Sequence, residues 1–333
     1  MGDFAKLDEL DRRIVAALQA NGRASWTAVA EAIGAPETTV ARRGQQLLES
    51  RTVKVTGLLD DLRCGLGISL LLRVRCRPGR ANAVAAALAD LPVTRFATVL
   101  SGSADVAAEI VVRRHEDVAT VLVDELPRPD DIAETESMVV VRKFLAFEEW
   151  DTGLLDPAAV AALRPAAAIP EHTRWQQTEQ LTEQEFAIAR LLARDGRATY
   201  SRIAAHTGIG ESTAARRVES LVARGCLRFR TMFEPPVLGF DVNFLQWLAV
   251  EPAELEEVGR RLAKEPSTRY VSATTGRFNL CLHGSLPGYG DLYEYLTRVV
   301  GALPGVHSAD MTLQAHTLKR AWLRLGPDGK VLP

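Results

Sequence analysis

The sequence predicts an α+β protein in which a two-domain unit, a small helical domain followed by a small sheet domain, occurs twice. Three observations lead to this fold class. Residues 22–56 carry the pattern of two short helices joined by a tight turn. The chain repeats itself at an offset of 174 positions, so that residues 7–60 align with residues 181–234 without a gap. After each helical segment, the apolar spacing changes from helical to strand-like.

The first helical pair has clear start and stop signals. Ser25 suits the N-cap of a short amphipathic helix, and Gly34 suits the left-handed turn that ends it. Pro36 suits the first turn of the next helix, because its missing N–H is unsatisfied there anyway. A helix over 7–20 precedes the pair, and residues 53–56 alternate like a short strand, either a wing or an exit ribbon. We therefore expect a winged helix-turn-helix domain.

The repeat preserves the residues that define this domain. The conserved run includes Gly22, Arg23, Ala24, Gly34, Ala41, Arg42 and Arg43, which recur as Gly196, Arg197, Ala198, Gly208, Ala215, Arg216 and Arg217. The same offset continues past the helices, where Gly102 falls on Gly276. The chain is therefore expected to be a duplication of a two-domain unit and not a solenoid.

The sheet domains are predicted from the order of their elements. Strands are expected over 68–75, 95–100, 106–112 and 135–144, with helices over 79–91 and 115–126. The second copy has strands over 243–250, 268–275, 278–284 and 306–318, with helices over 253–264 and 289–303. The order βαββαβ is ferredoxin-like. Both helices cover one sheet face, so the other face needs a partner, which predicts dimerisation through the sheets.

These elements give five segments. We expect winged helix-turn-helix domains at 5–60 and 181–236, ferredoxin-like effector domains at 65–146 and 240–326, and a proline- and alanine-rich, partly helical linker at 147–180.

Composition gives little support for a nucleic-acid partner. The net charge is −2. The second helical segment has nine arginines and six acidic residues, whereas the first has seven of each sign. The four cysteines form no CxxC pair, so neither a metal site nor a disulfide framework is expected. No apolar run approaches the roughly 18 residues of a membrane span. We expect a cytoplasmic protein without a cofactor.

The motifs together resemble the Lrp/AsnC (feast/famine) family of transcriptional regulators. They are L-D-E-L-D-R-R-I, N-G-R-A and T-T-V-A-R-R in the first copy, and S-T-A-A-R-R-V with T-T-G-R-F-N-L in the second. The resemblance implies DNA binding, effectors of the amino-acid type and assembly from dimers. Family members usually carry one copy of the unit, so this chain resembles a tandem fusion.

The second helix of each pair is expected to face DNA. With Val40, Gly44 and Leu47 inward, Arg42 lies opposite the core, where it can reach a guanine, and Arg43 lies on the flank near a phosphate. The DNA-binding candidates are Thr38, Thr39, Arg42, Arg43, Gln46, Ser212, Thr213, Arg216 and Arg217. The alternative is that the arginine pairs are merely a solvated surface. Trp26 and Tyr200 either donate to phosphate or pack in the core.

The two heads are not identical. Their recognition helices begin P-E-T-T-V and G-E-S-T-A, so an asymmetric operator is expected. Gly44 stands where the second copy has Val218, and Arg51 stands where it has Gly225, a left-handed position. The first head is therefore predicted to be the less stable.

The resemblance places the effector site near the turn between the second and third sheet strands, at contacts between effector domains. The implied residues are Ser101, Gly102 and Asp105, and Thr274, Thr275, Gly276 and Asn279. Asp105 has the charge to bind an α-ammonium group, which Asn279 lacks. The alternative is an ordinary hairpin turn capped by these two side chains.

Two other functions compete. Sirohaem decarboxylases share this layout, but they carry His, Tyr and Arg groups for an acidic tetrapyrrole, and strand T-R-Y-V-S-A-T-T-G-R-F-N-L has no such cluster. The second competing function is an oligomeric amino-acid sensor whose heads no longer bind DNA. No nucleophile constellation, P-loop or dinucleotide motif is present, so an enzyme is not expected.

Overall fold

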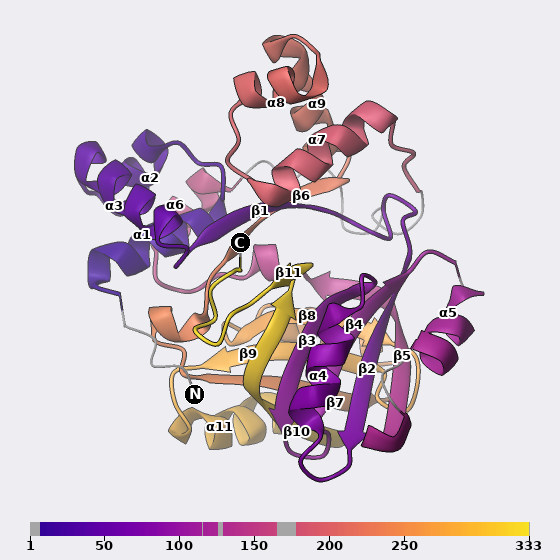
Figure 1. Ribbon diagram of the computed structural model, residues 1–333. Coiled ribbons are helices and arrows are strands. Elements are labelled where there is room, and N and C mark those ends of the chain that lie inside the picture. Colours follow the sequence, from indigo (N-terminus) through magenta and orange to yellow (C-terminus); the bar gives the residue numbers. More distant parts are fainter. Residues whose placement is uncertain (1–6, 115, 126–128, 165–177, 333) are drawn as a thin grey trace. The chain divides into compact units, whose positions relative to one another are not determined.

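The computed structural model describes residues 7–114, 116–125, 129–164 and 178–332 (Figure 1). These residues form two compact units, and each unit draws on both repeats. Residues 7–66 and 151–233 form the helical unit, whereas residues 67–150 and 234–332 form the sheet unit. The chain is therefore organised by pairing like domains of the two repeats.

The helical unit holds two three-helix heads. The first head consists of α1 (Glu9–Ala20), α2 (Trp26–Ile33), α3 (Glu37–Glu49) and β1 (Lys54–Leu59). The second consists of α7 (Glu183–Arg194), α8 (Tyr200–Thr207), α9 (Glu211–Ala223) and β6 (Leu227–Met232), and α6 (Pro157–Leu163) belongs to the same unit.

Local capping follows the sequence-based predictions with one shift. The Ser25 hydroxyl accepts a hydrogen bond from the Ala28 amide at 3.1 Å, which caps α2. Gly34 ends α2 with a φ of 64°, and Gly208 ends α8 with a φ of 71°. Pro36 is the N-cap of α3 and not part of its first turn. The turn signals therefore located both helix pairs.

The segment predicted as a wing or exit ribbon is a ribbon that joins the two heads. β1 pairs with β6 of the second head in an antiparallel ladder (Figure 1). Thr56 lies opposite Arg230, its own equivalent in the repeat. Because equivalent residues meet at one point of the ladder, the two heads are related by a pseudo-two-fold axis through this ribbon.

The sheet unit contains two βαββαβ domains. The first consists of β2 (Ile68–Cys76), α4 (Ala81–Asp90), β3 (Thr94–Ser101), β4 (Val106–Val112), α5 (Asp117–Thr120) with a following π turn (Val121–Glu125), and β5 (Ile132–Leu145). The second consists of β7 (Val242–Val250), α10 (Leu255–Leu262), β8 (Thr268–Thr274), β9 (Leu280–Leu286), α11 (Gly290–Glu294) with a π turn (Tyr295–Val299), and β10 (Val306–Arg320), followed by β11 (Leu323–Arg324). His115 and Leu126, the predicted ends of one helix, lie outside the described residues.

The two domains share one sheet among the described residues, in the order β11-β10-β3-β4-β2-β5-β8-β9-β7. The long strands β5 and β10 connect the domains. β5 pairs first with β2 of its own domain and then with β8 of the other, and β10 pairs first with β7 and then with β3. Because β10 pairs with both β3 and β7, the strands of this sheet other than β11 form a closed ring.

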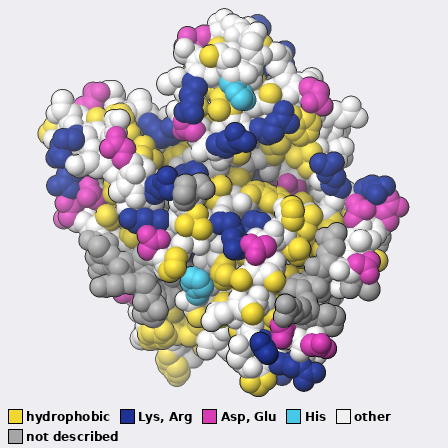
Figure 2. Space-filling model, in the orientation of Figure 1, with side chains coloured by type: hydrophobic (Ala, Val, Ile, Leu, Met, Phe, Trp, Pro, Cys, Tyr) yellow, Lys and Arg dark blue, Asp and Glu magenta, His cyan; other side chains and the backbone are white. Residues whose placement is uncertain are grey.

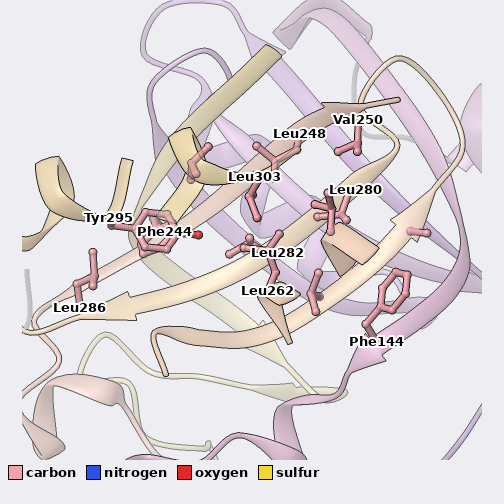
Figure 3. Close-up of a cluster of buried hydrophobic side chains, with 14 of the residues drawn as sticks. Phe144, Phe244, Leu248, Val250, Leu262, Leu280, Leu282, Leu286, Tyr295 and Leu303 are labelled. Atoms are coloured by element: carbon pink, nitrogen blue, oxygen red, sulfur yellow. The ribbon is translucent and has the colours of Figure 1, made fainter. Parts of the chain in front are cut away.

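Alternation along the strands separates outer and inner side chains. The outer face of each domain packs under its helices; Figure 3 shows the cluster of the second domain, where Phe244 and Tyr295 pack with ring centroids 4.9 Å apart. The inner faces of the two domains meet in a mixed cluster that includes Leu71, Met138, Leu245, Trp247 and Phe278. The sheet-to-sheet pairing that the sequence predicts therefore occurs within a single chain.

Candidate nucleic-acid interface and effector sites

The recognition helix α3 presents the face that its periodicity predicts. Val40, Gly44 and Leu47 are buried. Thr38, Arg42, Gln45, Gln46 and Glu49 are exposed, and Thr39 is half-buried. Arg42 donates from Nη1 to Gln46 Oε1 at 3.2 Å, which holds both side chains along the outer face. This face carries groups that can contact both bases and phosphates.

Arg43 lies on the flank of α3, where its side chain is half-buried. Its guanidinium forms ion pairs with Asp8 and with Asp11, the latter at 3.1 Å. The hydrogen bonds that Arg43 donates to these two carboxylates raise its pKa. Asp8 also caps α1 by accepting from the Asp11 amide at 2.9 Å. In this structure Arg43 fastens α3 to the start of α1 and does not project as a free cation.

The second head fastens its helices with a different arginine. Arg224, just after α9, pairs with Glu185 of α7 at 2.5 Å and with Glu179 at 3.1 Å. Arg216 is exposed and Arg217 is half-buried. No acidic side chain in the described part of the chain forms an ion pair with either of them. Two cations of α9 are therefore available, compared with one on α3.

The heads hold each other by a reciprocal pair of arginines. Arg23 of the first head donates to the carbonyl oxygens of Gly196 at 2.6 Å and Ala198 at 3.1 Å. Arg197 of the second head donates to the carbonyls of Gly22 at 2.7 Å and Ala24 at 2.9 Å. Burial and the proximity of Arg23 lower the pKa of Arg197.

Aromatic side chains complete these contacts. The Arg197 guanidinium lies over the ring of Trp26 at 4.5 Å, and that of Arg23 lies over Tyr200 at 5.2 Å. The ring of Trp26 also occupies the space beside Gly44, where a Cβ atom would lie 2.4 Å from it. Of the two roles predicted for Trp26 and Tyr200, these contacts favour packing. Figure 2 shows both basic and acidic side chains on the visible surface.

One local irregularity of the first head is as predicted. Arg51 has a φ of 57°, and its equivalent Gly225 has a φ of 71°. The left-handed conformation costs a non-glycine residue roughly 1–2 kcal/mol. The first head therefore carries strain that the second avoids.

The two turns assigned to effector binding lie at contacts between the domains. A Cβ on Gly102 would be 3.1 Å from Thr312 Cγ2 of β10. The Thr275 hydroxyl accepts from the Val139 amide of β5, and the Thr275 amide donates to the Val139 carbonyl, both at 2.9 Å. Each turn thus touches the long strand of the other domain.

The two polar side chains at these turns bind backbone. Asp105 Oδ2 accepts from the Cys76 amide at 2.7 Å. Asn279 accepts from the Val250 amide at 2.8 Å and donates to the Val250 carbonyl at 2.7 Å. Cys76 and Val250 are repeat equivalents, so the capping arrangement is the same in both domains. This geometry favours the alternative prediction of capped hairpin turns.

Sequence reasoning missed a buried arginine between the domains. Arg73, whose side chain is 5% exposed, lies over the rings of Trp247 at 4.9 Å and Phe278 at 5.0 Å. It pairs with Glu136 at 3.2 Å and also with Asp310. Nothing local marks Arg73 as special, because its partners come from both repeats.

A second buried polar group lies on the inner faces. Glu109 accepts from Arg95 Nε at 2.9 Å and also from Ser69. Burial alone raises the pKa of Glu109, but Arg95, Lys143 and Ser69 outweigh this effect and lower it to about 2.

Aromatic residues close this region. His283 of β9 has ring contacts with Phe96, Tyr270 and Phe147 at centroid distances of 5.2, 5.5 and 5.1 Å. The strand that contains Tyr270 has no histidine of its own, so its sequence alone does not indicate a His, Tyr and Arg cluster. His283 lies on the neighbouring strand, so the structure brings these residue types together.

Other site types are not supported within the described chain. No group of three or more His, Cys, Asp and Glu side chains is arranged to hold a metal ion. The cysteines are free and buried, although Cys64 Sγ lies 3.6 Å from the Cys226 carbonyl oxygen. No helix among these residues is both long and apolar enough to cross a membrane.

Comparison with known proteins gives consistent matches. Residues 7–48 and 181–222 match the AsnC-type helix-turn-helix domain, and residues 69–148 match the Lrp/AsnC ligand binding domain. An HTH-type transcriptional regulator of Pyrococcus furiosus is 30% identical over 135 residues, 40% of this chain and 91% of that protein. The HTH-type transcriptional regulator FL11 of Pyrococcus horikoshii is 28% identical over 140 residues, 42% of this chain and 92% of that protein.

A solved structure extends the similarity of fold along the chain. The siroheme decarboxylase NirDL aligns with a TM-score of 0.59 at 16% identity, covering 94% of this chain and 93% of its own. At this identity the comparison establishes a shared fold.

Proposed function

Because the chain belongs to the Lrp/AsnC family of transcriptional regulators, we propose that it regulates transcription by binding double-stranded DNA through both of its heads. The observation that carries this proposal is the pair of outward-facing recognition helices, α3 and α9, which belong to one compact unit. A family member with one head per chain needs a dimer to present two such helices. Here the duplication supplies both heads in a single chain.

The proposed contacts divide into two kinds. Arg42 and Arg216 lie at the centre of the exposed faces and are suited to bidentate contacts with guanine. The surrounding polar residues are suited to phosphate and backbone contacts, which position the protein without specifying a sequence. They are Thr38, Thr39, Gln46, Ser212, Thr213 and Arg217.

The effector of the proposed regulator is a small molecule of the amino-acid type that acts on the sheet unit. The support is the position of the two turns at the contacts between the domains, where a ligand would alter how the domains pair. The side chains of Asp105, Asn279, Thr274 and Thr275 already bind backbone groups. The ligand would therefore bind at the exposed Ser101 or take over one of these hydrogen bonds. Calorimetric titration with individual amino acids tests this assignment, with Thr275→Val as the variant expected to weaken binding.

Self-association is proposed to act at the level of whole chains. The inner sheet faces are covered within the chain, so a homodimer or larger assembly must use other surfaces. Light scattering with and without the bound amino acid tests whether ligand changes the assembly. An unchanged mass across all ligands that bind would remove assembly from the proposal.

The DNA-binding proposal is tested with the promoter flanking the protein's own gene. Fluorescence anisotropy at several salt concentrations measures binding of the wild type, Arg42→Ala and Arg216→Ala. Salt-sensitive binding that either substitution weakens is the expected result. Absence of binding under all effector conditions would favour an amino-acid sensor whose heads have lost DNA binding.

A second candidate is an enzyme that acts on an acidic tetrapyrrole, as the name of the NirDL structure suggests for that protein. The buried group of Tyr270, His283, Arg95 and Glu109 favours this candidate. Phe147 stacks on Tyr270 at 5.1 Å and fills the space beside His283, which opposes it. Mixing the protein with an iron porphyrin carboxylate and recording its absorbance spectrum distinguishes the two functions, because a DNA-binding regulator leaves the spectrum unchanged.

A further inference from the structure

The two heads differ in which arginine secures the recognition helix. In the first head, Arg43 of α3 pairs with Asp8 and Asp11 at the start of α1. In the second head, the equivalent of Asp8 is Thr182, which caps α7 by accepting from the Glu185 amide at 3.2 Å but has no charge. Glu185 instead pairs with Arg224, which lies where the first head has Ser50.

Because Arg43 is paired in the first head and Arg224 in the second, the two recognition helices present different charges. Arg43 already has two carboxylates beside it, and a DNA phosphate must compete with both of them. Arg217, its equivalent, has no ion pair with any acidic side chain in the described ranges. The exposed Arg216 lies next to it on α9. The second head therefore presents two uncompensated arginines, whereas the first presents Arg42 alone.

We propose that Asp8 and Asp11 withhold Arg43 from DNA, so that the operator has a strong half-site for the second head and a weak one for the first. This inference rests on the proposed DNA binding and specifies the class of operator. It also identifies Asp8 and Asp11 as residues that set the affinity of the first head without touching DNA. A single chain then binds in one preferred orientation.

The first test compares the two equivalent arginines on a short duplex of arbitrary sequence, since phosphate contacts do not require the operator. Affinity is measured by anisotropy over a series of salt concentrations. Each phosphate contact contributes about 0.9 to the slope of log K against log salt. Arg217→Ala is expected to lower the slope by about that amount, whereas Arg43→Ala is expected to leave it almost unchanged.

The second test restores the missing contact. The double variant Asp8→Thr/Asp11→Gln places a capping box at the start of α1 with the same spacing as Thr182 and Glu185 of α7 but without a charge, so α1 keeps its cap. Affinity is expected to rise, and the slope to steepen by about 0.9, because Arg43 becomes available. Adding Arg43→Ala is the matched control, and it should abolish the gain in slope. Thermal melting of each variant verifies that the heads remain folded.

The outcomes separate the two levels of the proposal. If the wild type binds no duplex even at the lowest salt, the proposed DNA binding fails. If the wild type binds but Arg43→Ala and Arg217→Ala lower the slope equally, only the inferred asymmetry is overturned. The inferred asymmetry is also overturned if the triple variant, Asp8→Thr/Asp11→Gln/Arg43→Ala, keeps the full gain in salt slope. The gain would then come from removing acidic charge alone.

Discussion

Replacing Gly44 with valine, the residue of the second head, should destabilise the first head. A Cβ at Gly44 would lie 2.4 Å from Cη2 and Cζ3 of Trp26, and the guanidinium of Arg197 covers that ring at 4.5 Å. Removing a glycine from a helix interior gains about 0.5 kcal/mol in helix propensity. Overpacking a filled site costs about 1–3 kcal/mol. The net loss is therefore about 0.5–2.5 kcal/mol, opposite in sign to what helix propensity alone predicts.

Hydrogen exchange measured by mass spectrometry checks this prediction, because α7–α9 serve as an internal reference for α1–α3 in the same chain. Gly44→Val should lower protection in α1–α3 only. The double variant Trp26→Tyr/Gly44→Val, which copies the pair Tyr200/Val218, should recover most of the loss. Increased protection in Gly44→Val, or an equal loss with and without Trp26→Tyr, would refute the packing argument.

Three further outcomes are expected. Arg51→Gly should stabilise the first head by about 1 kcal/mol by removing left-handed strain, measured by denaturant unfolding, whereas Gly225→Ala should destabilise the second by a similar amount. The pKa of Glu109 is lowered from 4.5 to about 2. The ionised carboxylate therefore contributes about 3 kcal/mol to the free energy of unfolding above pH 4.5, and this contribution is lost as the pH falls towards 2. Glu109→Gln should lack this part of the acid destabilisation, which is measured as the denaturant midpoint of unfolding at a series of pH values. Arg197→Ala removes two charge-assisted hydrogen bonds between the heads and should weaken their contact by about 2–4 kcal/mol, measured as faster hydrogen exchange of the β1 and β6 amides.

Features governed by local chemistry could be predicted from the sequence. Ser25 and Gly34 located a helix because capping depends on a few neighbouring residues. Arg51 was placed in the left-handed region because its repeat equivalent is a glycine. The inward stripe of Val40 and Leu47 also fixed which residues of α3 face outward. These inferences needed only short-range rules and the alignment of one repeat on the other.

Features that depend on contacts between the repeats could not be predicted in this way. The strand β1 was expected as a wing or ribbon, but its partner, β6, belongs to the other head. The ion pairs of Arg43 could not be predicted from the sequence, because Asp8 and Asp11 approach it only after α1 packs on α3. Gly44 was treated as a weakness of the helix, although the indole of Trp26 requires the space.

The effector region shows the same limit. The family resemblance implied that the two turns lie at domain contacts, as they do, but it did not reveal that Asp105 is bound by the Cys76 amide. The contact between His283 and Tyr270 could not be predicted either, because it depends on how β8 pairs with β9. Strand register sets which side chains meet on an inner face, and a single-residue shift would exchange them all.

Fusion of the two units has a physical consequence at the pseudo-two-fold axis. Arg73 and Trp247 are repeat equivalents, and the guanidinium of one lies on the ring of the other. In a homodimer with Arg73 in both subunits, two buried guanidinium groups would face each other, and the repulsion and lost hydration would be costly. A tandem chain can place unlike residues at equivalent positions, so a cation and an aromatic ring meet instead. The same freedom allows Thr182 to replace Asp8 in only one head. The proposed asymmetry in DNA binding and the specific pairing of the sheet domains therefore both depend on joining the two units in one chain.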